Sequence, residues 1–213
     1  MQPAYYFSRN LVLETERLLL RKIIPSDAPD MFDYASRPET SRYLLWFPHS
    51  SVSATLELIK YLQKEYLAGK FFDLGVVYKP AGKMIGTVGL TSYDDKNRCA
   101  ELGYVISPDY WHMGLAPEAL AALINFSFCE LGAHRVEAKY IEGNENSRRV
   151  MEKCGMHFEG IAKGKMYVKG AYRNIGCCAL LSDEYFSVPR ENIYGTKKKT
   201  TILDRIINRR NKN

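Results

Sequence analysis

The sequence predicts an α/β fold of the α+β type, in which a mixed, mostly antiparallel, twisted sheet is split by one central strand-helix-strand crossover. Two observations carry this prediction. Most of the short β-type runs are joined by turns of hairpin length, which favours antiparallel neighbours. One long apolar helix lies between two further runs, and such a crossover returns the chain to a parallel neighbour. The remaining helical patterns should cover both faces of the sheet.

The first strand and helix follow from the apolar pattern near the N-terminus. The run 16–24, ERLLLRKII, is rich in branched apolar residues and should form a strand that ends at Pro25. We expect Ser26 and Asp27 to cap a helix, and Pro38 to end it.

A second helix should start near Ser53 and end at Gly69, because its apolar residues recur at helical spacing. Between the two helices lies an aromatic-rich loop, 42–50, with the sequence RYLLWFPHS. Such a loop can line a substrate groove or simply cover the core.

The rest of the chain alternates strands and helices in the order that the fold class requires. We expect strands at 72–78, 84–90, 100–106, 135–141, 158–168 and 172–181, and helices at 115–131 and 146–153. The helix 115–131 is apolar around much of its circumference and should be largely buried.

Composition places the chain among globular domains. Its 213 residues, 46% of them apolar, can build one large core. No apolar run approaches the roughly eighteen residues of a membrane helix, and the first ten residues do not resemble a signal peptide. We therefore expect a cytoplasmic protein with no membrane partner. The five cysteines include no CxxC pair and the four histidines are scattered, so we expect neither a disulfide framework nor a metal.

The net charge of +6 is concentrated at the C-terminus. Residues 190–213 contain eight Lys or Arg against two acidic residues, which accounts for the whole excess. We predict one domain at 1–186 and a basic tail at 187–213. The tail can contact RNA or a ribosome, but a solvated terminal helix is the interpretation that we favour.

The stretch 101–119, ELGYVISPDYWHMGLAPEA, joins a strand to a glycine-bearing turn and then to a helix. Free backbone amides at a helix start carry partial positive charge, so a phosphate can bind there without a basic side chain. Ordinary turn chemistry explains the same glycine, and this window alone does not decide between the two.

Several phrases in order resemble the GNAT acetyltransferase superfamily, and more closely its RimJ/RimL branch. Residues 13–21 are similar to the opening phrase LxTxRLxLR, and 84–90 to an IGxxGL strand. The branch's E-[IL]-G-Y, W-x-x-G-x-[AG]-x-E-A and NxxS…EKxGF correspond to 101–104, 111–119 and 144–155. The resemblance extends over about 13–186 and implies the split sheet described above.

The resemblance implies that acetyl-CoA binds in the split, with its pyrophosphate on the amides of Met113, Gly114, Leu115 and Ala116. The pantetheine arm should pair with the exposed edge of Val105 and Ile106, and the Ile106 N–H could stabilise the oxyanion. Asn144 would orient the cofactor or the loop, although ordinary turn chemistry also explains an Asn there.

Three positions depart from the pattern beside this turn. The superfamily usually has Gln or Arg at Trp111, often Gly at His112, and often Lys or Arg at Met113. The backbone amides of the turn could still bind the phosphates, but no side-chain cation would assist them at these positions. Asn174 also departs from the branch, which often has Asp there.

Acetyl transfer to an amine needs a base for the amine and an acid for the leaving thiolate. Glu101, a carboxylate in an apolar strand, is the candidate base; the alternative is an ion pair with Arg98 or another cation. Ser147 is the candidate acid, because the position of the Tyr found in many relatives is Met151 and we therefore expect that no phenol is available for this role. The alternative is that Ser147 only caps the following helix.

We therefore predict an acetyl-CoA-dependent N-acetyltransferase that works by direct transfer in a ternary complex. The branch points to the α-amino group of a protein, of the ribosomal-protein type, as the acceptor. Small-molecule amines such as polyamines, amino acids or antibiotics are the alternative acceptors, and a non-catalytic acyl-CoA sensor is the alternative class. A covalent route through Cys99 is disfavoured, because no histidine has a spacing that identifies it as the base. A homodimer is compatible with this interpretation.

Overall fold

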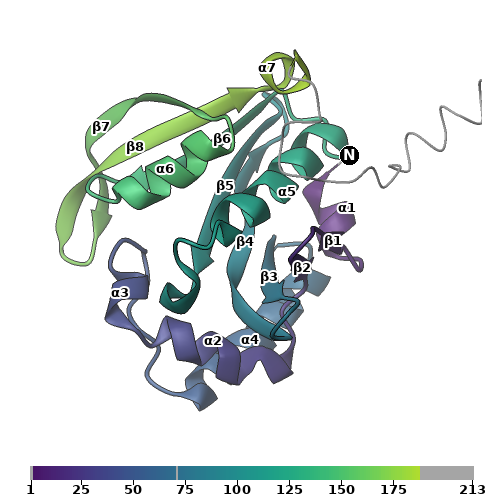
Figure 1. Cartoon of the computed structure of the whole chain (residues 1–213), viewed down its shortest axis with the longest axis vertical. Helices are drawn as coiled ribbons and strands as arrows, with labels where there is room; N and C mark the ends of the chain where they lie inside the picture. Colours follow the sequence, from purple (N-terminus) through teal and green to yellow (C-terminus); the bar gives the residue numbers. More distant parts are fainter. Residues whose placement is uncertain (1, 71, 188–213) are drawn as a thin grey trace, which may run out of the picture.

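A computed structural model describes residues 2–70 and 72–187 of the chain (Figure 1). Eight strands form one sheet in the order β1-β2-β3-β4-β5-β6-β8-β7. The strands are β1 (Leu13–Glu14), β2 (Leu18–Arg21), β3 (Asp73–Tyr78), β4 (Lys83–Asp94), β5 (Cys99–Ile106), β6 (Arg135–Ile141), β7 (His157–Val168) and β8 (Ala171–Leu181). Among the described strands only β5 and β6 pair in parallel, and every other neighbouring pair is antiparallel. The predicted fold class is confirmed.

Seven α-helices and two 3₁₀ turns accompany the sheet within the described residues. The helices are α1 (Pro3–Phe7), α2 (Ala28–Ala35), α3 (Pro38–Ser41), α4 (Val52–Leu67), α5 (Leu115–Cys129), α6 (Glu145–Lys153) and α7 (Ser182–Ser187). The 3₁₀ turns are η1 (Pro25–Asp27) and η2 (Pro108–Tyr110). The predicted basic tail lies outside the described residues, apart from Ser187.

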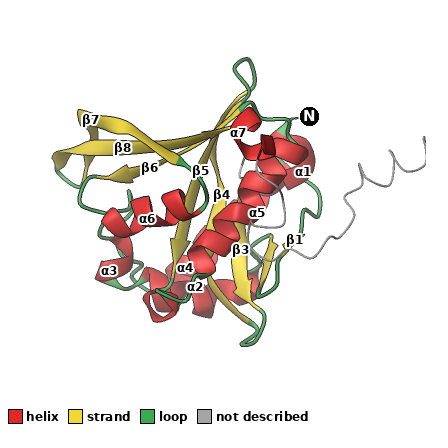
Figure 2. Ribbon diagram, turned by 45° about the horizontal axis from the view of Figure 1, so that its top comes forward, coloured by secondary structure: helices red, strands yellow, loops and turns green. Residues whose placement is uncertain are grey.

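The two faces of the sheet bury different helices. Leu18, Leu20, Leu74 and Val76 belong to the main core, together with much of α5. The residues that alternate with them on β2 and β3 point to the other face, where Val77 joins a second core with α2 and α4. Because alternate residues of these strands point to opposite faces, apolar side chains meet helices on both faces of the sheet. Figure 2 shows the helices around the sheet.

α5 is the crossover between the two parallel strands. Its glycine N-cap, Gly114, has φ of +75°, a left-handed conformation that a residue with a side chain rarely adopts. Leu115, Leu120 and Leu123 are almost completely buried under the sheet. This packing brings the start of α5 to the point where β5 ends.

The predicted cap of α2 is wrong in detail. The buried carboxylate of Asp27 does not cap α2; it accepts hydrogen bonds from the Ile24 N–H at 2.8 Å and from Arg21 at 2.7 and 2.8 Å. A nearby guanidinium and a free amide are stronger partners for this carboxylate than the helix amides. α4, in contrast, begins as expected, with Ser51 Oγ accepting from the Ala54 N–H.

Candidate active site

β5 and β6 are paired over only four residues and then separate. The last pair is Leu102 with Ala138, although β5 continues to Ile106 and β6 to Ile141. Figure 2 shows β6, β8 and β7 turning away from β5. A cleft of about 620 Å³ occupies this split, lined by side chains from three segments: 39–44, 104–117 and 143–153.

The open edge of β5 offers backbone groups to this cleft. The Ser107 N–H bonds to Ile85 O on β4 at 2.7 Å, and backbone groups alternate along a strand. The N–H groups of Tyr104 and Ile106 therefore point away from β4, into the split. An unpaired strand edge of this kind can pair with an amide-rich chain. Of the residues predicted for this edge, Val105 and Ile106 both line the cleft.

The turn before α5 closes one end of the cleft. Gly114, Leu115 and Ala116 line it, whereas Met113 is exposed and does not. The first N–H groups of a helix have no intrahelical partner, and together with the helix dipole they favour an anion. Pro117 has no N–H, and that of Glu118 bonds to Gly114 O, so within the first turn of α5 the donors are those of Leu115 and Ala116.

A buried carboxylate fixes this turn. Glu118 accepts hydrogen bonds from Thr15 Oγ1 at 2.5 Å and from the Arg17 backbone N–H at 2.9 Å, and it forms an ion pair with Arg17 Nε at 2.7 Å. The same guanidinium donates to the Met113 carbonyl at 2.9 Å. The N-terminal phrase and the phrase at 111–119 are thus joined in space, and their contact holds the glycine turn in place.

The structure accounts for two of the unusual residues before Gly114. His112 has φ of +61°, so this position favours the glycine that is common in the superfamily. The Trp111 indole Nε1 donates to the Ile106 carbonyl at 2.7 Å and ties the turn to the end of β5. Trp111 therefore has a structural role that keeps the two halves of the site together.

Ser147 and Asn144 lie on the opposite wall, where α6 begins. Asn144 is the N-cap residue, because its Oδ1 accepts the Ser147 N–H at 3.3 Å. The Ser147 hydroxyl is therefore not needed as a cap. It lies 2.9 Å from the Tyr104 hydroxyl, which also donates to the Ser147 carbonyl at 2.8 Å.

Tyr104 corrects the expectation that no phenol would be available. The sequence lacks a Tyr at position 151, but β5 supplies one from across the split, 43 residues before Ser147. Burial raises the pKa of Tyr104 above its ordinary value, so the phenol stays protonated at physiological pH. The sequence signal was present in the ELGY phrase, but nothing in the sequence shows that this side chain reaches Ser147.

Glu101 lies outside the cleft lining, on the face of β5 that is turned away from α5. Its carboxylate forms an ion pair with Lys139 Nζ at 2.5 Å, and Lys139 also contacts Glu137 at 3.1 Å. Partial burial lowers the pKa of Lys139, but its hydrogen bonds to both carboxylates outweigh this and raise it to about 12. Glu101 shares its face with the cleft-lining Val105, and Gly103 between them has no side chain.

α6 places two basic residues at the cleft. Arg149 and Lys153 line the cleft on the wall that faces the glycine turn. They are four residues apart, so they lie on the same face of the helix. The sequence pattern showed a basic helix but not which of its faces meets the cleft.

No cysteine lines the cleft in the described part of the chain. Burial raises the pKa of Cys99, and it raises that of Cys177 to about 11. Across residues 2–70 and 72–187, no group of three or more His, Cys, Asp or Glu is arranged to hold a metal ion. The same residues contain no helix long and apolar enough to cross a membrane.

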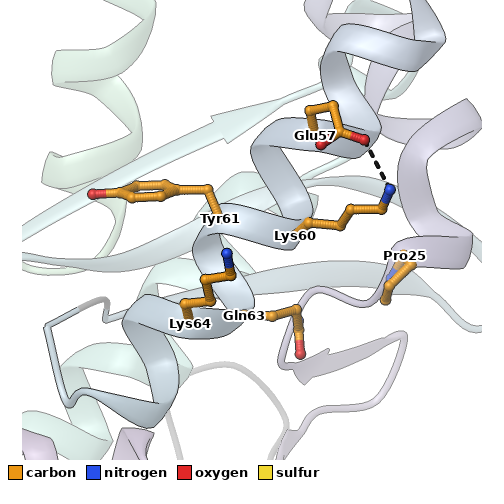
Figure 3. A pocket seen from close by; sticks show the side chains of 6 residues that line it. All are labelled: Pro25, Glu57, Lys60, Tyr61, Gln63 and Lys64. Carbon is orange, nitrogen blue, oxygen red and sulfur yellow. Dashed lines mark hydrogen bonds and ion pairs between the residues drawn. The ribbon is translucent and has the colours of Figure 1, made fainter.

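A second hollow of about 570 Å³ lies over the outer face of α4 (Figure 3). Its side chains are mostly solvated, and Lys60 and Glu57 pair with each other at 2.8 Å. Among the described residues, no free strand edge or α-helix start lines this hollow, whereas both line the cleft between β5 and β6. We therefore place the candidate site in that cleft.

A split mixed sheet with free backbone donors on one side of a cleft and a Ser-Tyr pair on the other has a geometry that suits an acyl-CoA thioester. Comparison with known proteins agrees, since residues 17–157 match the acetyltransferase (GNAT) domain. The chain belongs to the GNAT acetyltransferase family and is an acyltransferase; members of this family use acetyl-CoA.

Three relatives illustrate the similarity. The chain is 32% identical to the uncharacterized N-acetyltransferase YoaA of Bacillus subtilis (strain 168), over 75% of this chain and 90% of that protein. It is 28% identical to the [ribosomal protein uS5]-alanine N-acetyltransferase of Escherichia coli (strain K12), over 81% of this chain and 92% of that protein. A crystal structure of a GNAT-family acetyltransferase from Bacillus anthracis superposes with a TM-score of 0.73 at 25% identity, covering 82% of this chain and all of that one.

Proposed function

We propose that the protein transfers the acetyl group of acetyl-CoA directly to the α-amino group of a protein N-terminus, of the ribosomal-protein type. The observation that carries the transfer is the convergence of the Ile106 N–H, the Gly114–Ala116 turn and the Ser147 hydroxyl on one cleft. Similarity to an enzyme named for acetylating a ribosomal-protein alanine supports the choice of acceptor.

The residues present suit acetyl-CoA. The open edge of Tyr104 and Ile106 can pair with the amides of the pantetheine arm, and the amides of Leu115 and Ala116 can hold pyrophosphate oxygens. Asn144 caps α6 and so holds the opposite wall of the cleft. Arg149 and Lys153 add positive charge where the phosphates would lie. Acetyl-CoA supplies an activated thioester, and the protein supplies the groups that act on it.

In this proposal, four groups of the protein take part in the acetyl transfer. The Ile106 N–H donates to the carbonyl oxygen as the amine attacks and negative charge develops there. Glu101 takes the amine proton through a water, from the face opposite α5. As the C–S bond breaks, the Ser147 hydroxyl gives its proton to the sulfur, and water returns to the serine oxygen the proton that Glu101 took from the amine. Tyr104 holds Ser147 in position and remains neutral.

Two kinetic measurements test this function. Release of free thiol from acetyl-CoA should depend on a peptide with a free N-terminus and should vanish with the same peptide N-formylated. Initial rates at varied concentrations of both substrates should give intersecting reciprocal plots, whereas parallel plots would indicate a covalent intermediate. Tight CoA binding without turnover on peptides or small amines would favour a sensor and contradict the proposal.

The role of Ser147 has its own test. Ser147→Ala should lower kcat by about 10² with the KM for acetyl-CoA kept, in line with general acid contributions. Ser147→Thr, which keeps a hydroxyl, is the matched control and should retain most of the activity. Equal kcat values for the alanine variant and the wild type would exclude Ser147 as the acid.

A further inference from the structure

We infer that the outer rim of the cleft, formed by Leu45 and Phe47, binds large apolar side chains that follow the acetylated residue of a polypeptide acceptor. This inference rests on the proposed function and narrows its acceptor class. It starts from the aromatic-rich loop after α3, which the transfer mechanism does not use.

The loop 42–47 has two sets of side chains with different surroundings. Arg42, Tyr43 and Leu44 line the cleft, and Trp46 packs against the second core. Leu45 and Phe47 point outward and are 65% and 69% exposed. Two large apolar side chains thus stand in solvent next to residues that line the cleft.

This rim is held in place by Lys169, from a distant part of the chain, and by backbone hydrogen bonds within 35–49. The Lys169 ammonium, from the turn between β7 and β8, donates to the Ser41 carbonyl at 2.6 Å and lies 5.2 Å from the centre of the Phe47 ring. The His49 N–H bonds to the Ala35 carbonyl at 3.0 Å, and the Leu44 N–H to Ser41 O at 2.9 Å. A rim that is already ordered loses little entropy when a partner binds.

The length of an acceptor decides whether it can contact Leu45 and Phe47 while its amine lies in the cleft. Leu45 and Phe47 follow the cleft-lining Leu44 by one and three residues, so they lie at most about 11 Å further along the chain. An extended peptide advances about 3.3 Å per residue, and its second to fourth residues would span that distance. A small amine would be contained in the cleft and would leave both side chains in water. Burial of apolar surface would therefore favour a polypeptide with large apolar residues at these positions.

Acetylation of matched peptides tests the inference. The probes are a peptide that begins Ala-Phe-Phe, the same peptide beginning Ala-Ser-Ser, and alaninamide, which has the same α-amino group without the chain. For the wild type we expect kcat/KM to be about tenfold higher for the apolar peptide than for the Ser peptide, which equals about 1.4 kcal/mol. In Leu45→Ser/Phe47→Ser this preference should disappear through a higher peptide KM, with alaninamide turnover and the KM for acetyl-CoA unchanged.

Leu67→Ser is the control, because Leu67 is 79% exposed on α4 and should not affect any of these values. Equal rates with both peptides, or an unchanged preference in the double variant, would overturn the inference while leaving the proposed function intact. Turnover of small amines alone would contradict the proposed function and the inference with it. A dimer of the wild type that the double variant abolishes, without an effect on peptide kinetics, would assign the rim to self-association instead.

Discussion

The contact between Glu118 and the N-terminal segment should set both the stability of the domain and its affinity for CoA. Glu118→Gln keeps the shape of the side chain but removes its charge, so no cavity is created. The substituted amide then places an N–H donor against the Arg17 guanidinium, which is itself only a donor. The backbone N–H of Arg17 and the Thr15 hydroxyl keep at best a weaker, neutral acceptor.

The expected loss follows from burial. Breaking a buried ion pair costs about 3–5 kcal/mol. The Glu118 side chain is 9% exposed but that of Arg17 is 39% exposed, so water can partly solvate the orphaned cation. We therefore expect a loss near the lower limit, about 3 kcal/mol in the free energy of unfolding, or about 6–12 °C in Tm for a domain of this size.

Urea denaturation measures this loss, and calorimetric titration with CoA measures its consequence. CoA affinity should fall as well, because Arg17 also holds the Met113 carbonyl beside the glycine turn. Glu152→Gln is the matched control: its ion pair with Arg148 lies on the surface of α6 and should contribute under about 1 kcal/mol. If Glu118→Gln cost no more than this control, the buried pair would not stabilise the turn.

Three further predictions concern the turn, the base and the half-buried carboxyl of Asp73. Gly114→Asp should abolish CoA binding by placing a side chain and a negative charge at the anion site, and calorimetry showing unchanged affinity would mean that the phosphates bind elsewhere. Glu101→Gln should lower kcat/KM by about 10² with CoA affinity kept, and an unaltered pH–rate profile would exclude it as the base. Burial raises the pKa of Asp73 to about 7, so between about pH 4 and that value the folded chain holds a proton that the unfolded chain releases. The free energy of unfolding should therefore fall as pH rises across this window, and Asp73→Asn should flatten that dependence in denaturation series; a parallel decline in the variant would refute the assignment.

The fold could be predicted because long periodic segments dominate it. Leu18 and Leu20, and likewise Leu74 and Val76, alternate with other residues along the sequence, which predicts a strand at each position. The structure buries all four in one core. The short elements α1, α3 and α7 could not be predicted in this way, because they span only 4 to 6 residues and show too little periodicity. Their positions depend on tertiary packing, as when Phe7 of α1 packs against Phe126 of α5 with ring centres 6.0 Å apart.

The two sides of the candidate site differ in how far the sequence could describe them. The left-handed glycine could be predicted from the residues around Gly114, whereas the contact between Arg17 and Glu118 that holds the turn could not. The opposite wall depends on contacts between distant segments: Tyr104 meets Ser147 across the split, and Lys169 meets the loop after α3. No spacing rule connects such pairs, because they meet only once the whole sheet and its helices are assembled.

Glu101 is a single side chain whose partner, Lys139, could not be predicted from the sequence. The sequence offered two roles, a base and one half of an ion pair, and the structure provides the ion pair with Lys139. The two roles are compatible, because Lys139 is exposed and water can reach both partners. An acceptor of higher pKa holds its proton more tightly as its nitrogen attacks, so its reaction depends more on a base at this position. The loss of activity in Glu101→Gln should accordingly be larger for acceptors of high pKa than for weakly basic ones, and rates measured across a series of such amines would separate proton transfer from a purely structural ion pair.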